Sequence, residues 1–122
     1  MKELTIDIGK KHEDEAVRYL ENLNYKIMEQ NFKVLPIGEI DIIAKDKDTI
    51  VFVEVKYRKN KNFGTPAEFV TKSKQKKVIK TALCYIKQNK IKADIRFDVI
   101  SICQTEIEHI KNAFCHETYF TY

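Results

Sequence analysis

The sequence has no tryptophan and few of the residues that bend, loosen or cross-link a chain. Its 122 residues include only three glycines, two prolines and three cysteines. So few glycines and prolines leave no room for a flexible linker, and no low-complexity tract or internal repeat is present. The longest apolar runs are about four residues, far short of a membrane-spanning helix. These absences predict one domain over residues 1–122 that does not enter a membrane.

The cysteines and the first residues exclude further classes of protein. The cysteines are odd in number and contain no C-x-x-C pair, so neither a disulfide framework nor a zinc site follows. Residues 1–7 are polar where a secretory signal would be apolar, so a cytoplasmic location is expected. None of the histidines has a partner at metal-ligand spacing, and we interpret them as structural or surface residues: His12, His109 and His116.

The spacing of apolar residues predicts the order of the secondary-structure elements. The expected elements are a helix over 7–23, a strand over 25–34, a hairpin over 38–45 and 49–57, a basic loop over 58–66, a helix over 67–89, a strand over 95–103, a short strand around 107–110, and a last strand or docked tail over 118–122. This order predicts an α/β fold with a mixed β-sheet flanked by helices.

Two acidic residues lie inside the apolar runs of the predicted hairpin. Asp41 lies within 38–44 and Glu54 within 50–56. A charge in the middle of a strand is costly unless it is paired or bound to a metal. If Lys47 and Asp48 form a two-residue loop, facing residues have numbers that sum to 95, and Asp41 faces Glu54.

This register separates the side chains of the hairpin into two faces. One face is apolar and carries Ile40, Ile42, Ala44, Val51, Val53 and Val55. The other carries Glu39, Asp41, Ile43, Phe52, Glu54 and Lys56. Opposed carboxylates repel each other, and a divalent cation bound between them makes their proximity favourable. The loop lacks the glycine usual in such turns, and a solvated hairpin face is the alternative interpretation.

Two helical residues extend the candidate site. Glu13 lies on the same stripe as Ala16 and Leu20 of the first helix. It is either a residue favoured by the helix dipole or a third carboxylate directed at the hairpin. Gln75 extends the apolar stripe of the second helix by one turn toward its N-terminus.

The net charge of +4 conceals a strong asymmetry. Residues 56–80 contain nine basic residues and one acid, so their net charge is +8 and that of the remainder is −4. A lysine-rich solvated helix face is the common explanation of such a segment. Because this basic segment directly follows the acidic hairpin, we favour the alternative that it binds a polyanion. The residues expected to contact a nucleic-acid backbone are Arg58, Lys59, Lys61, Lys72, Lys74, Lys76 and Lys77.

The order of an acid in the first helix, Asp41, and then Glu54-x-Lys56 resembles the PD-(D/E)xK nuclease superfamily, as arranged in archaeal-type Holliday-junction resolvases. The chain as a whole resembles the YraN-like family of small bacterial proteins. The matching stretches are Gly9-x-x-His12-Glu13-x-x-Ala16-x-x-Tyr19-Leu20, residues 38–44, 51–56 and 64–68, Lys74-Gln75-x-Lys77, and residues 96–99 and 112–114. His12 stands where the family usually has glycine, and Ile40 stands where the superfamily name has proline.

The resemblance implies a restriction-endonuclease-like fold and a phosphodiesterase site that uses Mg²⁺ or Mn²⁺. The implied metal ligands are Asp41, Glu54, the backbone carbonyl of Val55, and Glu13. The implied catalytic residues are Glu13, Asp41, Glu54, Lys56 and Gln75. Lys56 would position the attacking water or stabilise the charge that develops on phosphorus. Gln75 would orient Lys56 or contact phosphate.

Three functions are compatible with the sequence. The first is a metal-dependent endonuclease that acts on structured or branched nucleic acid, with DNA as the expected substrate. The second is a non-catalytic nucleic-acid-binding module on a nuclease-like scaffold. The third is a protein-interaction domain with an acidic pocket, which leaves the +8 segment unexplained. Resolvase-like proteins act as dimers, so a homodimer is also an expectation, although no self-complementary surface is visible in the sequence.

Overall fold

The computed structural model describes residues 5–59 and 70–115, with side chains from Ile8 onward. The elements are α1 (Thr5–Asn22), β1 (Lys26–Val34), β2 (Gly38–Asp46), β3 (Thr49–Tyr57), α2 (Lys72–Gln88), β4 (Asp94–Cys103) and β5 (Glu106–Phe114). The interpretations of residues 60–69 and 116–122, including the basic loop and the last strand or tail, lie outside these described ranges. Within them, no helix has the length and apolar character needed to span a bilayer.

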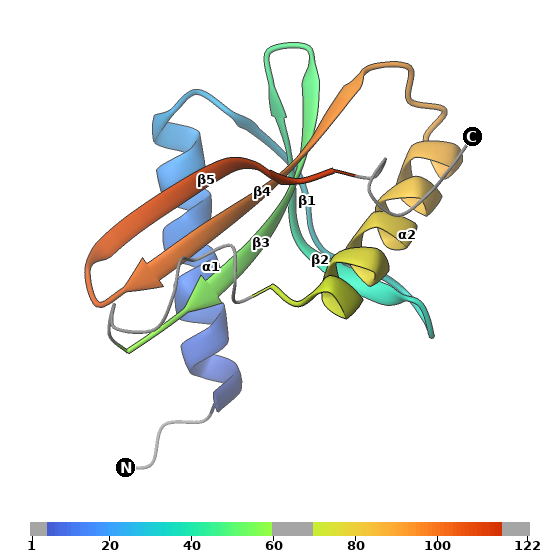
Figure 1. The fold of residues 1–122 in the computed structure, drawn as a ribbon. Coiled ribbons are helices and arrows are strands. Elements are labelled where there is room, and N and C mark those ends of the chain that lie inside the picture. Colours follow the sequence, from blue (N-terminus) through green and yellow to red (C-terminus); the bar gives the residue numbers. More distant parts are fainter. Residues whose placement is uncertain (1–4, 60–69, 116–122) are drawn as a thin grey trace.

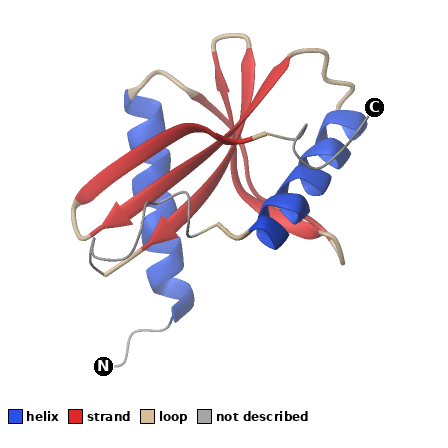
Figure 2. Cartoon of the chain, viewed as in Figure 1, coloured by secondary structure: helices blue, strands red, loops and turns tan. Residues whose placement is uncertain are grey.

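The five strands form one mixed sheet in the order β1-β2-β3-β4-β5. Strands β3 and β4 are parallel and are joined through α2, whereas the other neighbours are antiparallel. Figure 1 shows α1 and α2 on either side of this twisted sheet, and Figure 2 shows the same view by type of element. The predicted α/β fold with helices flanking a mixed sheet is confirmed.

Each face of the sheet buries its own apolar cluster. The α2 cluster includes Ile43, Phe52, Val78, Ile79, Ala82, Phe97 and Val99. The α1 cluster includes Ala16, Leu20, Ile42, Ala44, Val51, Val53, Ile100 and Ile102. Side chains of a strand alternate between faces, so a strand covered on both sides is apolar at nearly every position. The two helices therefore cover the β2–β3 hairpin from opposite faces of the sheet.

The β2–β3 hairpin has the predicted register. Its five pairs run from Ile42 opposite Val53 to Asp46 opposite Thr49, and the numbers of each pair sum to 95. The ladder ends at Ile42, so the predicted pair of Asp41 and Glu54 is not part of it. The loop has two residues, and Lys47 adopts the left-handed conformation with φ of 55°. This conformation supplies the turn that glycine usually provides.

The prediction for Ile40 was wrong. Ile40 packs in the α2 cluster, although the expected alternation placed it with Ile42 on the other face. The β2–β3 ladder ends at Ile42, and before that residue β2 pairs only with β1. This arm of the β1–β2 hairpin can therefore twist away from β3 toward α2, and alternation along the sequence does not report that twist.

Two predicted boundaries also change. Helix α2 begins at Lys72, because the Thr71 side chain caps it by accepting a hydrogen bond from Lys74 N at 3.1 Å, whereas the predicted start at residue 67 lies outside the described residues. Strand β5 is longer than the predicted strand around 107–110 and reaches Phe114, which pairs with Phe97.

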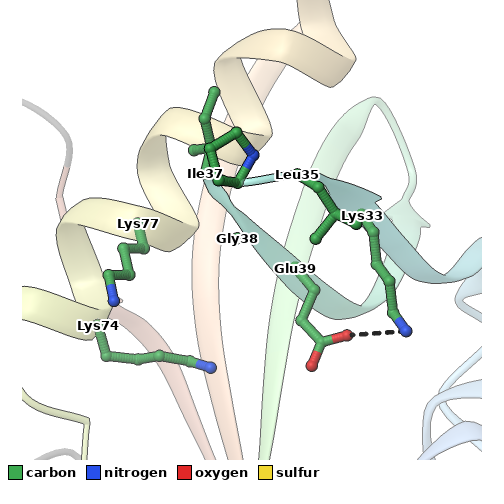
Figure 3. A pocket seen from close by; sticks show the side chains of 8 residues that line it. Lys33, Leu35, Ile37, Gly38, Glu39, Lys74 and Lys77 are labelled. Atoms are coloured by element: carbon green, nitrogen blue, oxygen red, sulfur yellow. Dashed lines mark ion pairs between the residues drawn. The ribbon is translucent and has the colours of Figure 1, made fainter.

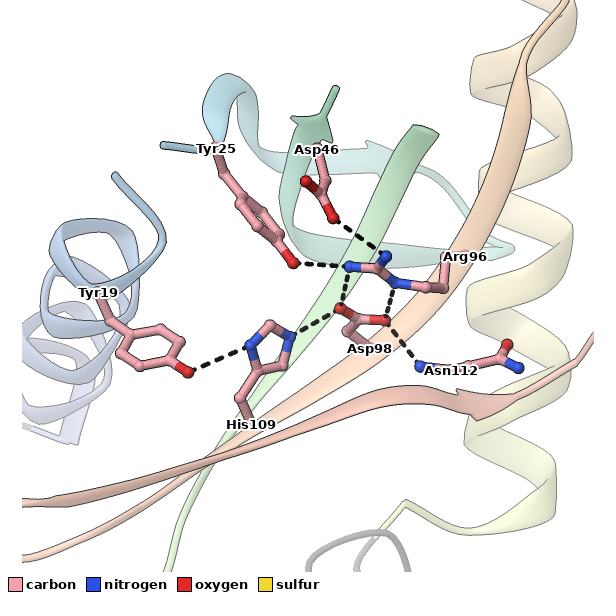
Figure 4. Close-up of polar contacts among 7 residues, drawn as sticks. All are labelled: Tyr19, Tyr25, Asp46, Arg96, Asp98, His109 and Asn112. Atoms are coloured by element: carbon pink, nitrogen blue, oxygen red, sulfur yellow. Dashed lines mark hydrogen bonds and ion pairs between the residues drawn. The ribbon is translucent and has the colours of Figure 1, made fainter. Parts of the chain in front are cut away.

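A buried polar network joins β4 to β5 and α1 (Figure 4). Asp98 is fully buried and lies where the β4–β5 register shifts. Its carboxylate accepts from Arg96 Nε at 2.9 Å, from His109 Nε2 at 2.7 Å and from Asn112 N at 2.9 Å. His109 Nδ1 in turn lies 3.3 Å from the Tyr19 hydroxyl of α1. The interpretation of His109 as a structural residue agrees with these contacts.

The network balances the charge of Asp98. Burial alone would raise the pKa of Asp98, but the hydrogen bonds from His109, Arg96 and Asn112 N together lower it. Arg96 also donates to Tyr25 Oη at 2.8 Å and to Asp46 Oδ2 at 3.2 Å, and so connects the network to the start of β1 and the end of β2. All acceptor capacity of Asp98 is used within the fold.

We expect Asp98→Asn to destabilise the fold by about 3 kcal/mol at neutral pH, because it removes the buried carboxylate that pairs with Arg96 and leaves Arg96 with Asp46 as its remaining ion-pair partner. Since the folded-state pKa of Asp98 is lowered, its contribution is present above the unfolded value of 3.8 and is lost as pH falls through the folded value. The difference between wild type and variant in urea unfolding should therefore shrink below about pH 4. Asp94→Asn, at an exposed position, is the control. An equal difference at pH 3 and pH 7 would contradict this assignment.

Candidate functional site

The candidate site begins where β2 separates from β3. The ladder between them ends at the pair of Ile42 and Val53, and Asp41 is the next residue of β2. Asp41 Oδ2 accepts a hydrogen bond from Val55 N at 2.8 Å. A side-chain carboxylate thus takes the place of a strand partner at this point. The hydrogen bond fixes Asp41 against the backbone of Val55, whose carbonyl was a predicted metal ligand.

Glu54 is buried beside this junction. It is only 2% exposed, and it lies on the side of β3 that also carries Phe52 and faces α2. Its Oε2 atom lies 3.7 Å from Lys74 Nζ of α2. Its Oε1 atom is buried and has no hydrogen-bond partner among the described residues. A buried carboxylate oxygen without a partner is costly, and a cation is the partner that would satisfy it.

The two carboxylates influence each other's protonation. Burial is the largest cause that raises the pKa of Glu54, to about 8, and repulsion from Asp41 is the next. Burial also raises the pKa of Asp41, against the hydrogen bond from Val55 N. Lys74 and Lys56 act on both groups in the opposite direction. Near neutral pH the pair therefore holds less than its full negative charge unless more positive charge is supplied.

Glu13 approaches Asp41 from α1. Both residues line a cavity of about 280 Å³, together with Val55, His12 and Tyr57. Glu13 Oε1 is buried and has no hydrogen-bond partner among the described residues. Burial, followed by repulsion from Asp41, raises the pKa of Glu13. The predicted third carboxylate is thus directed toward the hairpin.

The cavity has a flat aromatic wall and does not include every predicted ligand. The rings of His12 and Tyr57 stack with centroids 4.1 Å apart. Glu54 is not among the residues that line this cavity. Across the described ranges, no group of three or more His, Cys, Asp and Glu side chains is arranged to hold a metal. Asp41 and Glu54 are within electrostatic reach of each other. Asp41 lines the cavity together with Glu13 and Val55, whereas Glu54 lies on the side of β3 that faces α2.

Lys56 and Gln75 occupy different positions relative to the acids. Lys56 is half-buried, lies two residues after Glu54 on β3, and lowers the pKa of both carboxylates, so it is within their electrostatic reach. The Gln75 side chain donates through Nε2 to Val70 O at 2.9 Å. This bond ties Gln75 to the chain just before α2, and its role toward Lys56 or phosphate stays a prediction.

The N-terminal end of α2 concentrates positive charge. Its first turn contains no acid and includes Lys72 and Lys74. Cations are unfavourable at the positive end of a helix dipole, which instead attracts anions. Lys74 is partly compensated by Glu54, and Lys72 is exposed. This end of α2 therefore faces the acids with a surplus of positive charge.

The predicted backbone-binding residues divide into groups. Those that are exposed are Lys59, Lys72, Lys76 and Lys77. Lys74 pairs with Glu54, which sequence reasoning did not anticipate because the two residues are twenty positions apart. Arg58 forms an ion pair with Glu108 at 3.5 Å, and its side chain is only 11% exposed, so phosphate would have to compete for it. Lys61 lies outside the described residues.

The fold and this site define an α/β protein whose mixed sheet carries a buried acidic pair beside a basic helix. The model of the family described as "Uncharacterised protein family UPF0102" matches residues 12–102, and the chain belongs to this family. The predicted YraN-like membership is thereby confirmed. The matched range contains Glu13, Asp41 and Glu54.

Similar proteins match along nearly their whole length. A UPF0102 protein of Francisella tularensis subsp. novicida (strain U112) is 48% identical over 112 residues, which cover 90% of this chain and 96% of the relative. A UPF0102 protein of Thermodesulfovibrio yellowstonii is 50% identical over 109 residues, which cover 89% and 96%. A UPF0102 protein of Sulfurihydrogenibium sp. (strain YO3AOP1) is 48% identical over 110 residues, which cover 89% and 95%.

We expect the metal-free protein to lose stability as pH rises from about 4.5 to 8, because the folded-state pKa of Glu54 is raised to about 8 from 4.5. A raised carboxyl pKa contributes stability below the unfolded value, and this is lost as pH rises through the folded value. Glu54→Gln should remove a difference on the order of 3 kcal/mol across this window in EDTA, measured by urea unfolding. Glu21→Gln, at an exposed position on α1, is the control. Parallel pH profiles for wild type and Glu54→Gln would contradict the raised pKa.

Proposed function

We propose that this protein is a divalent-metal-dependent endonuclease that hydrolyses phosphodiester bonds in structured or branched DNA. The observation that carries the proposal is the buried Glu54 carboxylate, which has one unpartnered oxygen and lies within electrostatic reach of Asp41 where two strands separate. The arrangement of Asp41 and Glu54-x-Lys56, and its resemblance to the PD-(D/E)xK nuclease superfamily, supports this assignment.

The donor atoms fit a hard divalent cation. Carboxylate and backbone carbonyl oxygens are the ligands preferred by Mg²⁺, which Mn²⁺ can replace. Asp41, Glu54 and the carbonyl of Val55 would hold the ion, and its charge would satisfy the unpartnered Glu54 oxygen. A cation held there would supply the positive charge that stabilises phosphoryl transfer and acidifies water.

Apart from the cation, three residues of the protein have separate roles. The hydrogen bond from Val55 N holds Asp41 in one orientation, which reduces the cost of organising the site on binding. Lys56 brings a positive charge to the same face of β3 as Glu54, where negative charge develops on a reacting phosphate. Lys74 would remain near Glu54 and contact the phosphate backbone from α2.

The cavity between α1 and the sheet suits the attacking water. Glu13 and Asp41 both line it, and burial raises the pKa of Glu13, which makes it a stronger base than an exposed glutamate. The stacked rings of His12 and Tyr57 also line it. Glu13 is therefore proposed to orient or deprotonate this water and not to bind the cation directly.

A second function shares the same surface. The exposed lysines of α2 would also serve a non-catalytic nucleic-acid-binding module, and a cytoplasmic location and a homodimer are compatible with both functions. The unpartnered oxygens of Glu13 and Glu54 favour the endonuclease, because a binding module gains nothing from burying unsatisfied carboxylates. A panel of labelled linear, single-stranded, flapped and four-way DNA substrates with Mg²⁺, Mn²⁺ or EDTA separates the two functions.

We expect Asp41→Asn and Glu54→Gln to abolish Mg²⁺-dependent cleavage and to remove the rise in melting temperature that Mg²⁺ gives the wild type. The amide variants are preferable to alanine because Asn retains an acceptor for Val55 N. Lys56→Ala should keep that rise while cleavage falls about a hundredfold or more, since it removes only transition-state stabilisation.

The matched controls are Asp48→Asn and Lys45→Ala, both at exposed positions of the same hairpin. Neither should change cleavage or the response to Mg²⁺. If Mg²⁺ raises the melting temperature of Asp41→Asn and Glu54→Gln as much as that of the wild type, no cation binds between these carboxylates. The binding-module function would then be the better explanation.

We expect combined Lys72→Ala and Lys77→Ala substitutions to weaken DNA binding in EDTA and to reduce the slope of log affinity against log salt by about two, because each lysine displaces roughly one counterion. The double variant Lys87→Ala and Lys90→Ala, near the other end of α2, is the control. Fluorescence anisotropy at several salt concentrations measures both quantities. An equal loss in the two double variants would show a general charge effect and no localised binding face.

A further inference from the structure

A groove lies between the tip of the β1–β2 hairpin and α2. It has a volume of about 380 Å³ and combines two kinds of lining. Leu35, Pro36 and Ile37 form an apolar end, whereas Lys74 and Lys77 line the side that belongs to α2 (Figure 3). A base and a phosphate need these two surfaces side by side, and a nucleotide fits a groove of this size.

The hairpin tip is held rigidly against α2. Val34 pairs with Gly38, so the tip contains three residues. A Cβ atom at Gly38 would lie 3.1 Å from Thr81 Oγ1 and 3.3 Å from Lys77 Cβ, so glycine allows the tip to pack closely on α2 without crowding these atoms. Further along β1, Phe32 packs edge-to-face on Tyr85 of α2, with ring centroids 5.1 Å apart. Contacts at both levels therefore fix the direction in which the tip points.

The tip exposes an unusually large apolar side chain. Leu35 is 83% exposed, the highest value among the exposed large apolar residues of the described ranges. Single exposed apolar residues are common, but this one adjoins a cationic groove on a rigid support. Apolar side chains of this kind enter between bases in proteins that unstack nucleic acids. Leu35 is exposed enough for such a contact, and the packing of the hairpin tip on α2 supports it.

The charges of the residues that line the groove favour the binding of an anion. It is lined by three lysines and one acid, Glu39, which forms an ion pair with Lys33 at 3.8 Å (Figure 3). Among the described residues Lys77 has no ion-pair partner. Lys74 lines the groove and also lies 3.7 Å from Glu54, so the groove adjoins the acidic pair.

We propose that this groove binds an unpaired nucleotide of a DNA substrate, with its base against Leu35 and its phosphate on Lys77. The proposal rests on the proposed function, because Lys74 then places the bound strand next to Asp41 and Glu54. It specifies the substrate class further: DNA with an unpaired nucleotide beside the point of cleavage, as at a bulge, gap or branch. A continuous duplex offers the lysines its phosphates but offers Leu35 no accessible base face.

The experiment compares two DNA duplexes that differ by one unpaired 2-aminopurine, with wild-type protein in EDTA so that cleavage does not occur. We expect wild type to bind the interrupted duplex at least about fivefold more tightly and to change the fluorescence of the unpaired base. Leu35→Ser should remove this preference and the fluorescence change, with unchanged affinity for the continuous duplex. Lys77→Gln should weaken binding to both. Leu23→Ser, 43% exposed at the end of α1, should behave as wild type.

Equal affinity of wild type for the two duplexes would overturn the proposal, as would a preference that survives in Leu35→Ser. The failure of the proposed function is a different result. If a Leu35-dependent preference is found in EDTA but no cleavage occurs with Mg²⁺ or Mn²⁺, the nucleotide-binding role of the groove is supported and the endonuclease activity is contradicted. If cleavage depends on Asp41 and Glu54 but the protein shows no preference for the interrupted duplex, the endonuclease activity is supported and the groove assignment is wrong.

Discussion

The hydrogen bond from Val55 N to Asp41 is the interaction on which the candidate site depends. It occurs where β2 stops pairing with β3 and continues with β1 alone. A strand that leaves a sheet exposes backbone donors, and Asp41 satisfies one of them with its side chain. The same departure opens the cavity toward α1 and sends the β1–β2 hairpin toward α2. One local change in pairing therefore creates both the acidic site and the groove beside it.

Helix α2 connects the two surfaces electrostatically. As the crossover between parallel strands it must lie on one face of the sheet, and its N-terminal end falls beside Glu54 because α2 follows β3 in the chain. The lysines of its first turn oppose the helix dipole, a cost that Glu54 offsets only partly. A bound polyanion would offset the remainder, which gives the basic composition of α2 a physical reason.

Much of this fold could be predicted from the sequence because both faces of the central strands are covered. Alternation then determines the register, and the pairing of residues whose numbers sum to 95 followed from it. The position of Ile40 did not follow, because twist beyond the end of a ladder leaves no periodic signal. The Lys74–Glu54 and His109–Asp98 contacts did not follow either, since they depend on how distant elements pack. Arg96 and Asp98 did carry a signal, as charged residues two apart on one face of a buried strand.

The two most deeply buried acids among the described residues, Asp98 and Glu54, differ in how completely the fold satisfies them. Asp98 accepts from Arg96, His109 and Asn112 N, and these donors lower its pKa against the effect of burial. Glu54 has one lysine at 3.7 Å and one unpartnered oxygen, and burial raises its pKa to about 8. The first acid is complete within the fold, so its burial costs little. The second is not, and the free energy that its burial costs is recovered only when something positive binds beside it. That deficit is the strongest reason to place the proposed cation site at the junction of β2 and β3 and not in the larger polar network.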